Sequence, residues 1–397
     1  MSNVLFINGP ASGHVYPTLG LVEELIAMGE KVFYVSSEEF RDKLERLGAA
    51  FTSYDNFLAR ENPFETKRYL SLVIKILSSY DTILPCILEL AQHHSFDYII
   101  HDSMYGCGNV ASDSLGIPNI ATCSSFVNSE RLLSANRGNT ARLKENLLLV
   151  KEFCALSANI RAKYNIRRRL DIGDVFFNGG KINLVFTSEY FQPQSESIAE
   201  HFKFVGPIVT DRYEPIELPV DRFRGRRVIY ISMGTVFNDV KEFYELCFDS
   251  LASFDGHVIL SVGSRINVTS LESIPDNFTV LPYAPQLQIL PYTDVFITHG
   301  GMNSVNEALY YNVPLIVIPM AADQPIVGNR VAELGAGLTL DRISLTALNL
   351  RESVEEILSA GRYHENSSRI GDSLRMAGGQ KKAIEEILKF KEFYKIR

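Results

Sequence analysis

Short apolar runs alternate with helical patterns along the first half of the chain. From residue 17, a helical pattern places Leu21, Leu25 and Met28 on one face and ends at Gly29. The β-rich runs around such patterns predict buried strands at residues 4–8, 31–36, 98–102, 119–124 and 182–187. Strands that alternate with helices at this spacing predict right-handed crossovers and a parallel sheet.

A second series of strands and helices follows a break in this pattern. Residues 211–221 carry two prolines and mixed charge, which is typical of a linker. The strands predicted beyond it are residues 228–232, 257–262, 278–281, 295–299 and 315–319. The predicted fold class is therefore α/β, with two doubly wound, Rossmann-like domains of similar size on either side of a linker.

Two parts of the first half do not follow the alternation. Residues 55–80 and 125–175 are rich in Leu, Phe and Tyr, and we predict that they are irregular segments that shape a substrate pocket. The same composition also suits ordinary core packing, so the two interpretations stay open.

Composition narrows the class of protein. At about 150 residues per domain, 397 residues predict two or three domains. The net charge of −8 argues against a nucleic-acid-binding protein, which needs a basic face. The chain begins without a charged segment before its first apolar run, and no apolar run approaches ~18 residues. We therefore expect a soluble, cytoplasmic protein with no integral membrane association.

The pattern of cysteines also favours a cytoplasmic protein. They are scattered, odd in number and without a C-x-x-C pair, at residues 86, 107, 123, 154 and 247. This pattern is typical of reduced thiols in the cytosol and predicts neither a disulfide framework nor a zinc site.

Candidate chemistry in the second half lies where predicted strands end, since ligands of open parallel sheets bind beyond the carboxyl ends of the strands. His299 ends one strand and is followed by Gly300 and Gly301, and then by a helical pattern that includes Asn303 and Ser304. Glycines allow backbone N–H groups to approach an anion, and a helix N-terminus attracts negative charge. The segment therefore predicts a phosphate site.

Two further features bear on this site. Gly234 and Thr235 follow the strand at 228–232 and form a second glycine-hydroxyl turn, so that a diphosphate fits better than a single phosphate. Ser304 and Glu307 also match a helix capping box, so a capping role and a ligand contact for Glu307 both stay open.

In the first half, His14 lies in the loop after the first strand, and Asp102 ends the strand at 98–102. An aspartate can fix the tautomer of an imidazole and support its charge after proton uptake, which predicts a catalytic pair. The alternative is a loop histidine and an aspartate that caps the following helix. His101 should point to the other face of its strand. The loop lacks G-x-G-x-x-G, so the dinucleotide-binding motif is absent.

Taken together, these residues resemble the UDP-dependent glycosyltransferases of the GT-B fold, and specifically the bacterial macrolide and flavonoid type. In plant and related members one segment reads aromatic-x-P-Q, H-x-G-W-N-S-x-x-E, G-V-P and D-Q. The matching positions here are Tyr283-Ala-Pro-Gln286, His299-Gly-Gly-Met-Asn-Ser304, Glu307, Val313-Pro314 and Asp323-Gln324, with Gly13-His14-x-x-Pro17 near the N-terminus. The similarity covers essentially the whole chain.

The resemblance implies an organisation in which two facing domains enclose a cleft. It implies an acceptor-binding domain at residues 1–210, a linker at 211–225 and a nucleotide-sugar-binding domain at 226–380. We expect residues 381–397 to form a helix that packs back on the first domain.

The resemblance also implies a role for each motif residue. Gly234, Thr235, His299, Gly301, Asn303 and Ser304 would hold the diphosphate. Tyr283 would lie against the uracil ring, with Gln286 near the base and Glu307 on the ribose hydroxyls. Asp323 and Gln324 would bind the donor sugar, and His14 and Asp102 would be the base and its partner. Tyr283 replaces the usual tryptophan of the family, which weakens base stacking and the preference for uridine over thymidine. Met302 replaces the tryptophan inside the H-x-G-W-N-S segment.

The implied reaction is the transfer of a hexose from a UDP-sugar to a hydroxyl of a small lipophilic acceptor such as a flavonoid or macrolide. The expected hexose is glucose. The transfer would invert the anomeric centre and give a β-glycoside. No cofactor and no essential metal is expected, because the chain has no D-x-D motif. The alternatives are a nucleotide-sugar epimerase or hydrolase of the same fold, a non-catalytic nucleotide-sugar-binding protein, and an NAD-dependent oxidoreductase, which the missing glycine motif disfavours.

Overall fold

The computed structural model describes residues 2–58, 69–105, 107–127, 140–210, 218, 223, 225–235 and 238–397. The chain forms two compact units. The first comprises Met1–Ser188, Gln194–Ile208 and Ala377–Arg397, and the second comprises Glu189–Pro193 and Val209–Met376. Most of the expected linker at 211–225 lies outside the described residues.

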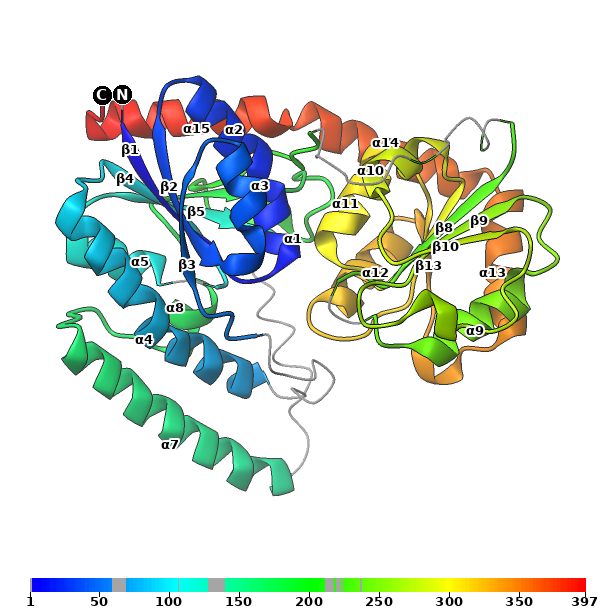
Figure 1. Ribbon diagram of the computed structural model, residues 1–397, viewed down its shortest axis with the longest axis horizontal. Helices are drawn as coiled ribbons and strands as arrows, with labels where there is room; N and C mark the ends of the chain where they lie inside the picture. Colours follow the sequence, from blue (N-terminus) through cyan, green and yellow to red (C-terminus); the bar gives the residue numbers. More distant parts are fainter. Residues whose placement is uncertain are drawn as a thin grey trace. The chain divides into compact units, whose positions relative to one another are not determined.

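The first unit contains a seven-stranded parallel sheet in the order β3-β2-β1-β4-β5-β6-β7 (Figure 1). Its strands are β1 (Asn3–Ile7), β2 (Lys31–Ser37), β3 (Ala50–Tyr54), β4 (Tyr98–Asp102), β5 (Asn119–Cys123), β6 (Ile182–Val185) and β7 (Phe202–Phe204). The longer helices are α2 (Leu19–Ala27), α4 (Tyr69–His93), α5 (Gly108–Leu115), α7 (Thr140–Lys163) and α15 (Gly379–Tyr394), and the short ones are α1 (Ser12–Val15), α3 (Arg41–Arg46) and α8 (Ile172–Phe176).

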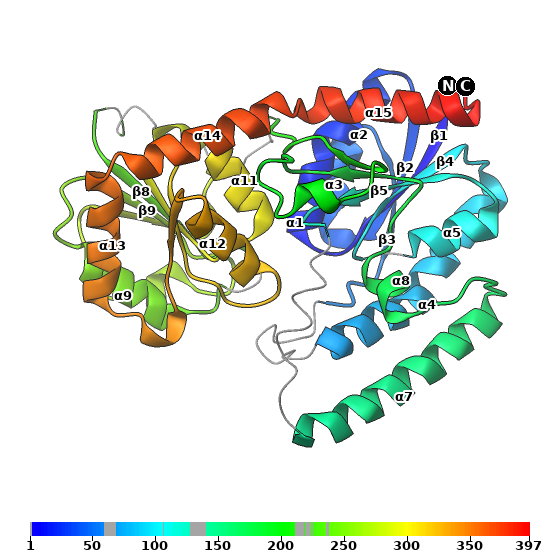
Figure 2. The same cartoon turned by 180° about the vertical axis from the view of Figure 1, so that it is seen from behind.

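Helices cover both faces of this sheet because successive side chains of a strand point to opposite sides. Leu5 and Ile7 of β1 pack with apolar residues of α4, α5, α7 and α8. Val4 and Phe6, which alternate with them, pack with residues of α2, α3 and α15. Figure 2 shows α4 and α7 side by side on one face, as Figure 1 does from the front.

The second unit contains a six-stranded parallel sheet in the order β10-β9-β8-β11-β12-β13. Its strands are β8 (Val228–Ser232), β9 (His257–Ser261), β10 (Phe278–Leu281), β11 (Val295–Thr298), β12 (Leu315–Val317) and β13 (Gly337–Thr339). Its helices are α9 (Lys241–Leu251), α10 (Gln286–Ile289), α11 (Met302–Tyr310), α12 (Gln324–Glu333), α13 (Ala347–Ser359) and α14 (Arg362–Met376). The expectation of two doubly wound α/β domains is confirmed.

The expectation of irregular structure at 55–80 and 125–175 is wrong over much of both ranges. Helix α4 begins at Tyr69, and α7 extends from Thr140 to Lys163. Helix α4 spans 25 residues with one apolar face and contains Pro85, which is unfavourable in a helix interior. In α7 the apolar residues are spread around the helix instead of forming a stripe. The remaining parts, residues 59–68 and 128–139, lie outside the described residues.

Helix α4 is long and apolar enough, over Leu70–His93, to cross a membrane by length and composition. Its apolar side chains are used in the core of the first unit. Val73, Ile76, Leu77 and Tyr80 are at most 1% exposed and pack against the sheet. The segment is therefore accounted for as a core helix.

Helix α15 returns the end of the chain to the first unit. Ala383, Ile387 and Phe390 join the buried cluster beneath β1 and β4. At the same place the Lys391 ammonium donates to the buried carboxylate of Glu30, which also accepts a hydrogen bond from the Tyr98 hydroxyl. Removing one partner of such a buried pair leaves the other charge buried and unpaired, which is more destabilising than breaking a surface pair.

Replacing Phe390 by Ala should therefore destabilise the first unit, because its ring is 4% exposed and its removal leaves a cavity. We expect a loss of about 3–5 kcal/mol in the free energy of unfolding. Phe393, on the same helix and 78% exposed, is the matched control, and Phe393→Ala should change that free energy little. Denaturant unfolding of both variants measures the difference, and equal effects would show that α15 is not part of this core.

Candidate active site

The first candidate site lies at the point where the strand order of the first sheet reverses. Strands β2 and β3 lie on one side of β1, and β4 to β7 lie on the other, so the loops after β1 and β4 diverge from adjacent strand ends. Such a switch point is where ligands of doubly wound sheets bind. His14 lies on α1, directly after β1, and Asp102 is the last residue of β4.

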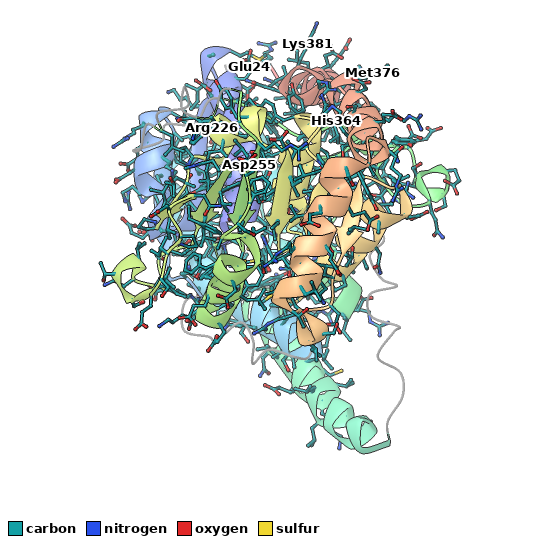
Figure 3. The ribbon with its side chains drawn as sticks, turned by 90° about the vertical axis from the view of Figure 1, so that its right-hand side faces the viewer. Glu24, Arg226, Asp255, His364, Met376 and Lys381 are labelled. Carbon is teal, nitrogen blue, oxygen red and sulfur yellow. The ribbon has the colours of Figure 1, made fainter. Side chains whose placement is uncertain are left out.

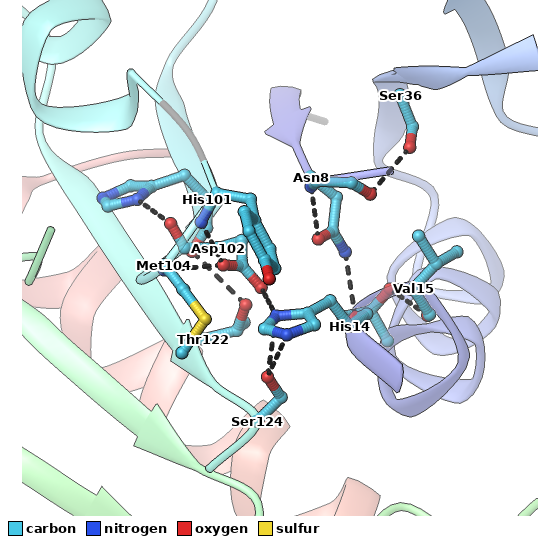
Figure 4. A network of polar contacts seen from close by, with 12 residues as sticks. Asn8, His14, Val15, Ser36, His101, Asp102, Met104, Thr122 and Ser124 are labelled. Atoms are coloured by element: carbon cyan, nitrogen blue, oxygen red, sulfur yellow. Dashed lines mark hydrogen bonds and ion pairs between the residues drawn. The ribbon is translucent and has the colours of Figure 1, made fainter. Parts of the chain in front are cut away.

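The structure brings these two side chains together. Nδ1 of His14 lies 2.6 Å from Oδ2 of Asp102, and the side chains are 14% and 1% exposed respectively (Figure 4). The other carboxylate oxygen of Asp102 accepts hydrogen bonds from the backbone N–H groups of Met104 and Tyr105, at 2.6 and 2.7 Å. Asp102 is therefore fixed by three donors.

This environment determines the protonation of the pair. Burial by itself would raise the pKa of Asp102, but His14 and the two backbone N–H groups outweigh it and hold that pKa below its usual range. A carboxylate can only accept, so Nδ1 of His14 carries the proton that it shares with Asp102. Nε2 of His14 is then left with a lone pair that can take a proton from a substrate.

The alternative in which Asp102 caps the following helix is wrong. The helix α5 begins at Gly108, and the residue at its N-cap position is Cys107. Asp102 instead holds the turn at Met104 and Tyr105. It is a turn residue with one oxygen directed at the imidazole.

His101 is buried and separate from the pair. Its Nδ1–H donates to the backbone carbonyl of Asp102, and its Nε2 accepts from the side-chain amide of Asn119. Burial lowers its pKa to about 4, so it is neutral at neutral pH. These partners are consistent with the expectation that His101 points away from the pair.

Two residues that the sequence did not single out also contact His14. The hydroxyl oxygen of Ser124 lies 2.8 Å from Nδ1 and 3.5 Å from Nε2 (Figure 4). Tyr105 lies edge-on to the imidazole, with ring centroids 4.7 Å apart. Ser124 follows β5, so the rule that polar residues at strand ends carry chemistry could have found it.

The second candidate site lies at the corresponding reversal in the other sheet, between β8 and β11. The turn after β8 contains Gly234, and His299 follows β11. A side chain at Gly234 or at Gly301 would lie 2.6 or 2.5 Å from the His299 ring. Both positions therefore have to be glycine for the imidazole to lie between the two turns.

His299 acts as a neutral group. Its side chain keeps some access to solvent, yet the protein atoms packed around it lower its pKa to about 4. At neutral pH the imidazole can therefore offer an N–H to an anion but no charge. Positive potential at this place comes from the N-terminus of α11, where Gly301 is the N-cap residue.

The capping-box interpretation of Ser304 and Glu307 is wrong, because α11 begins earlier, at Met302. Glu307 is 1% exposed, and its two carboxylate oxygens accept from the side-chain amides of Gln286 and Asn303, at 2.6 and 2.7 Å. Three residues expected at the donor site are therefore connected directly.

The other expected donor residues lie around the same edge of this sheet. Thr235 is exposed after β8, Tyr283 and Ser304 are partly buried, and Asp323 is the N-cap residue of α12. Gln324 is buried, and its carbonyl oxygen accepts from the backbone N–H groups of Met320 and Ala321. It therefore fixes the loop after β12.

A cavity of about 980 Å³ lies elsewhere in the second unit, next to the amino ends of β8 and β9. Its lining includes Arg226 and Asp255, which are labelled in Figure 3, and Arg351. Arg351 already donates to the backbone carbonyls of Asp249 and Ser250. Ligands of parallel sheets bind at carboxyl ends, whereas this cavity lies at the end of the sheet opposite to the second candidate site.

No cluster of three His, Cys, Asp or Glu side chains that could hold a metal ion occurs within the described parts of the chain. The carboxylates of Asp102 and Glu307 are instead bound by imidazole, amide and backbone donors.

Comparison with known proteins gives consistent matches. The model of the erythromycin biosynthesis protein CIII-like C-terminal domain matches residues 245–381. An uncharacterized UDP-glucosyltransferase, YojK, of Bacillus subtilis (strain 168) is 36% identical over 396 residues, which are 98% of this chain and 97% of that protein. The NDP-glycosyltransferase YjiC of the same bacterium is 35% identical over 394 residues, with 98% and 97% covered.

Solved structures match over the same length. The glycotransferase of kitacinnamycin has a TM-score of 0.83 and 26% identity, with 98% of each chain covered. A calicheamicin glycosyltransferase has a TM-score of 0.83 and 25% identity, with 99% of this chain and 98% of that chain covered.

Replacing Gly301 by Ala should displace His299, because the added Cβ would lie 2.5 Å from its Nε2. We expect the affinity for UDP to fall by about tenfold or more, which corresponds to about 1.4 kcal/mol. Gly361 has no atom within 4 Å of the position of such a Cβ, so Gly361→Ala should bind UDP as the unaltered chain does. Calorimetric titration compares the two, and unaltered affinity in Gly301→Ala would overturn the assignment of this site.

Proposed function

This chain belongs to the bacterial glycosyltransferases of the macrolide and flavonoid type, which have the GT-B fold, and from this membership we propose that it transfers a hexose from a UDP-sugar to a hydroxyl of a small lipophilic acceptor. The observation that carries the proposal is the 2.6 Å contact between His14 and the buried Asp102 at a sheet switch point. A non-catalytic binding protein does not need this pair, whereas a hydrolase or epimerase would turn over the donor without any acceptor.

In the proposed reaction His14 is the general base. Its Nε2 takes the proton of the acceptor hydroxyl while the oxygen attacks the anomeric carbon, and the bond from that carbon to the diphosphate breaks. Asp102 stabilises the imidazolium that forms, because it remains a carboxylate. General-base assistance of this kind is worth roughly 10²–10⁴ in rate. One displacement inverts the anomeric centre, so an α-linked donor gives a β-glycoside.

We assign the diphosphate to the turns around His299. The N-terminal N–H groups of α11, the side chains of Asn303 and Ser304, the Gly234-Thr235 turn and the neutral His299 would stabilise the negative charge that develops on the leaving group. The proposal gives no role to a metal ion. In this proposal Asp323 and Gln324 bind the hydroxyls of the donor sugar.

The nucleoside is assigned to the residues around Glu307. Its present partners, Gln286 and Asn303, are neutral amides, which ribose hydroxyls can replace without leaving a second charge buried. Tyr283 would lie against the base. The relatives carry the printed names UDP-glucosyltransferase and NDP-glycosyltransferase, which supports a nucleotide-sugar donor, and we propose UDP-glucose as that donor.

The acceptor side is aromatic and apolar close to His14. Tyr105 lies against the imidazole, and the Phe57 ring lies 6.4 Å from the Tyr105 ring. Gly9 makes room for this arrangement, since a Cβ there would lie 2.2 Å from that of Tyr105. Such a surface suits a flat lipophilic acceptor. The kitacinnamycin and calicheamicin glycosyltransferases, by their names, act on natural products, which supports an acceptor of that class.

The five cysteines are free thiols, three of them buried, which supports the proposal that the reaction takes place in the reducing cytosol.

We predict that His14→Ala removes transfer to alcohol acceptors, with kcat lower by roughly 10²–10⁴, while UDP affinity is unchanged. The base is lost, but the residues assigned to UDP lie in the other unit. Acidic phenols and thiols, which are already largely deprotonated, should keep more of their rate. Asp102→Asn should show a milder form of the same defect.

The measurement is kcat for an alcohol and for an acidic phenol, in both proteins, with calorimetry of UDP binding as the control. If both acceptors react with His14→Ala at the original rates, His14 is a structural loop residue and the proposed mechanism is wrong.

A further inference from the structure

A chain of buried polar side chains lies beneath the turn that carries His14. Asn8, Tyr34 and Thr18 are each 0% exposed, although they come from the end of β1, from β2 and from the short 3₁₀ turn that follows α1. Burying polar groups is unfavourable unless every donor finds an acceptor. The partners of these three residues are therefore informative.

All the side-chain donors of the three residues have acceptors. The Asn8 amide donates to the backbone carbonyl of His14 at 3.1 Å (Figure 4) and to the Tyr34 hydroxyl at 2.8 Å. The Tyr34 hydroxyl lies 3.0 Å from that of Thr18, which itself donates to the backbone carbonyl of Val15 at 2.7 Å. Since the Thr18 proton is used in that bond, Tyr34 donates to Thr18.

The network is also anchored to the sheet. The carbonyl oxygen of the Asn8 side chain accepts from the N–H of Gly9, and its backbone carbonyl accepts from the Tyr54 hydroxyl at 2.6 Å. Ser36 donates to the backbone carbonyl of Gly9 (Figure 4). One end of the network is thus fixed on three neighbouring strands, and the other end reaches the main chain of His14 and Val15.

The turn that carries His14 needs hydrogen bonds from outside itself to hold its geometry. Helix α1 has only four residues, which is too short for its own hydrogen bonds to hold it. Apart from its chain neighbours and the backbone of its own helix, no atom lies within 4 Å of the position of a Cβ at Gly13. The base, however, has to keep its Nδ1 2.6 Å from Asp102, and a misplacement of about 1 Å can cost about 100-fold in rate.

We propose that Asn8, Tyr34 and Thr18 form a positioning network that holds the main chain of His14 and Val15 so that the imidazole meets Asp102 and points its Nε2 at the acceptor. This inference rests on the proposed role of His14 as general base. None of the three side chains touches substrate, so each acts through His14. A fully satisfied buried network favours one geometry, which apolar residues of the same size do not.

The protonation of Tyr34 agrees with this arrangement. Burial raises the pKa of its hydroxyl well above the ordinary value, and its contacts with Thr18 and Asn8 do not cancel that effect. The hydroxyl therefore keeps its proton at any pH at which the enzyme works, and the direction of the network does not change.

The test uses Tyr34→Phe and Thr18→Val, each of which removes one hydroxyl and little volume. With an alcohol acceptor, kcat should fall by about tenfold or more, and the KM for the donor should not change. With an acidic phenol as acceptor, which needs the base less, kcat should fall by a smaller factor. Thr18→Ser keeps the hydroxyl and should restore most of the rate that Thr18→Val loses.

The matched control is Tyr98→Phe, which removes another buried tyrosine hydroxyl from the same unit. Tyr98 is the first residue of β4, and its hydroxyl donates to the carboxylate of Glu30. His14 lies at the opposite end of the sheet, beyond the carboxyl end of β1. Tyr98→Phe should lower the melting temperature of the protein without changing the ratio of the two acceptor rates. If it changes that ratio as Tyr34→Phe does, the effect is general loss of stability and the network has no positioning role.

A double-mutant cycle separates this inference from the proposed function. In the His14→Ala background, Tyr34→Phe should cause no further loss, since the network acts through the imidazole. A full additional loss would overturn the inference. If His14→Ala itself has no effect, the proposed function fails. If His14→Ala abolishes transfer and both Tyr34→Phe and Thr18→Val leave the acceptor ratio unaltered, only the network proposal fails.

Discussion

The parallel pairing of adjacent strands at the two switch points is the constraint on which both candidate sites depend. In the first sheet Ile7 pairs with His101, so the residues that follow β1 and those that end β4 emerge side by side. In the second sheet Thr298 pairs with Ser232, which brings the turn at Gly234 to His299. A shift of one residue in either register would turn these side chains to the opposite face. The geometry of the sites is thus set by the pairing of the strands from whose ends their residues emerge.

At each site, burial and hydrogen bonding determine whether the carboxylates and imidazoles are charged. Asp102 and Glu307 are each 1% exposed, and donors occupy both oxygens of each carboxylate. His101 and His299 are kept neutral by the protein around them, with pKa values of about 4. His14, at 14% exposure, is the imidazole of the first site that is both paired with a carboxylate and open to solvent. The three histidines therefore differ in their surroundings: His14 is paired with a carboxylate, whereas His101 and His299 are neutral.

Much of the architecture could be predicted from the sequence, because the central strands are unbroken apolar runs buried on both faces. The edge strands β3, β7 and β13 were missed, since they are short and mostly only partly buried, which gives no clear pattern. Helix α7 was missed because it shows no single apolar stripe, whereas α4 was missed although it has an apolar face. The strand-end rule found His14, Asp102 and His299. It did not find Ser124 or the network around Asn8, whose importance lies in contacts between segments that are distant in the sequence.

The central claim is that a base-assisted single displacement moves the sugar, without a metal ion, from donor to acceptor. The most direct measurement is the anomeric configuration of the product, determined by proton NMR after reaction of UDP-α-glucose with a phenolic acceptor in the presence of EDTA. The account predicts a β-glucoside, formed only when the acceptor is present. An α-glucoside, or release of free glucose without transfer to the acceptor, would contradict it.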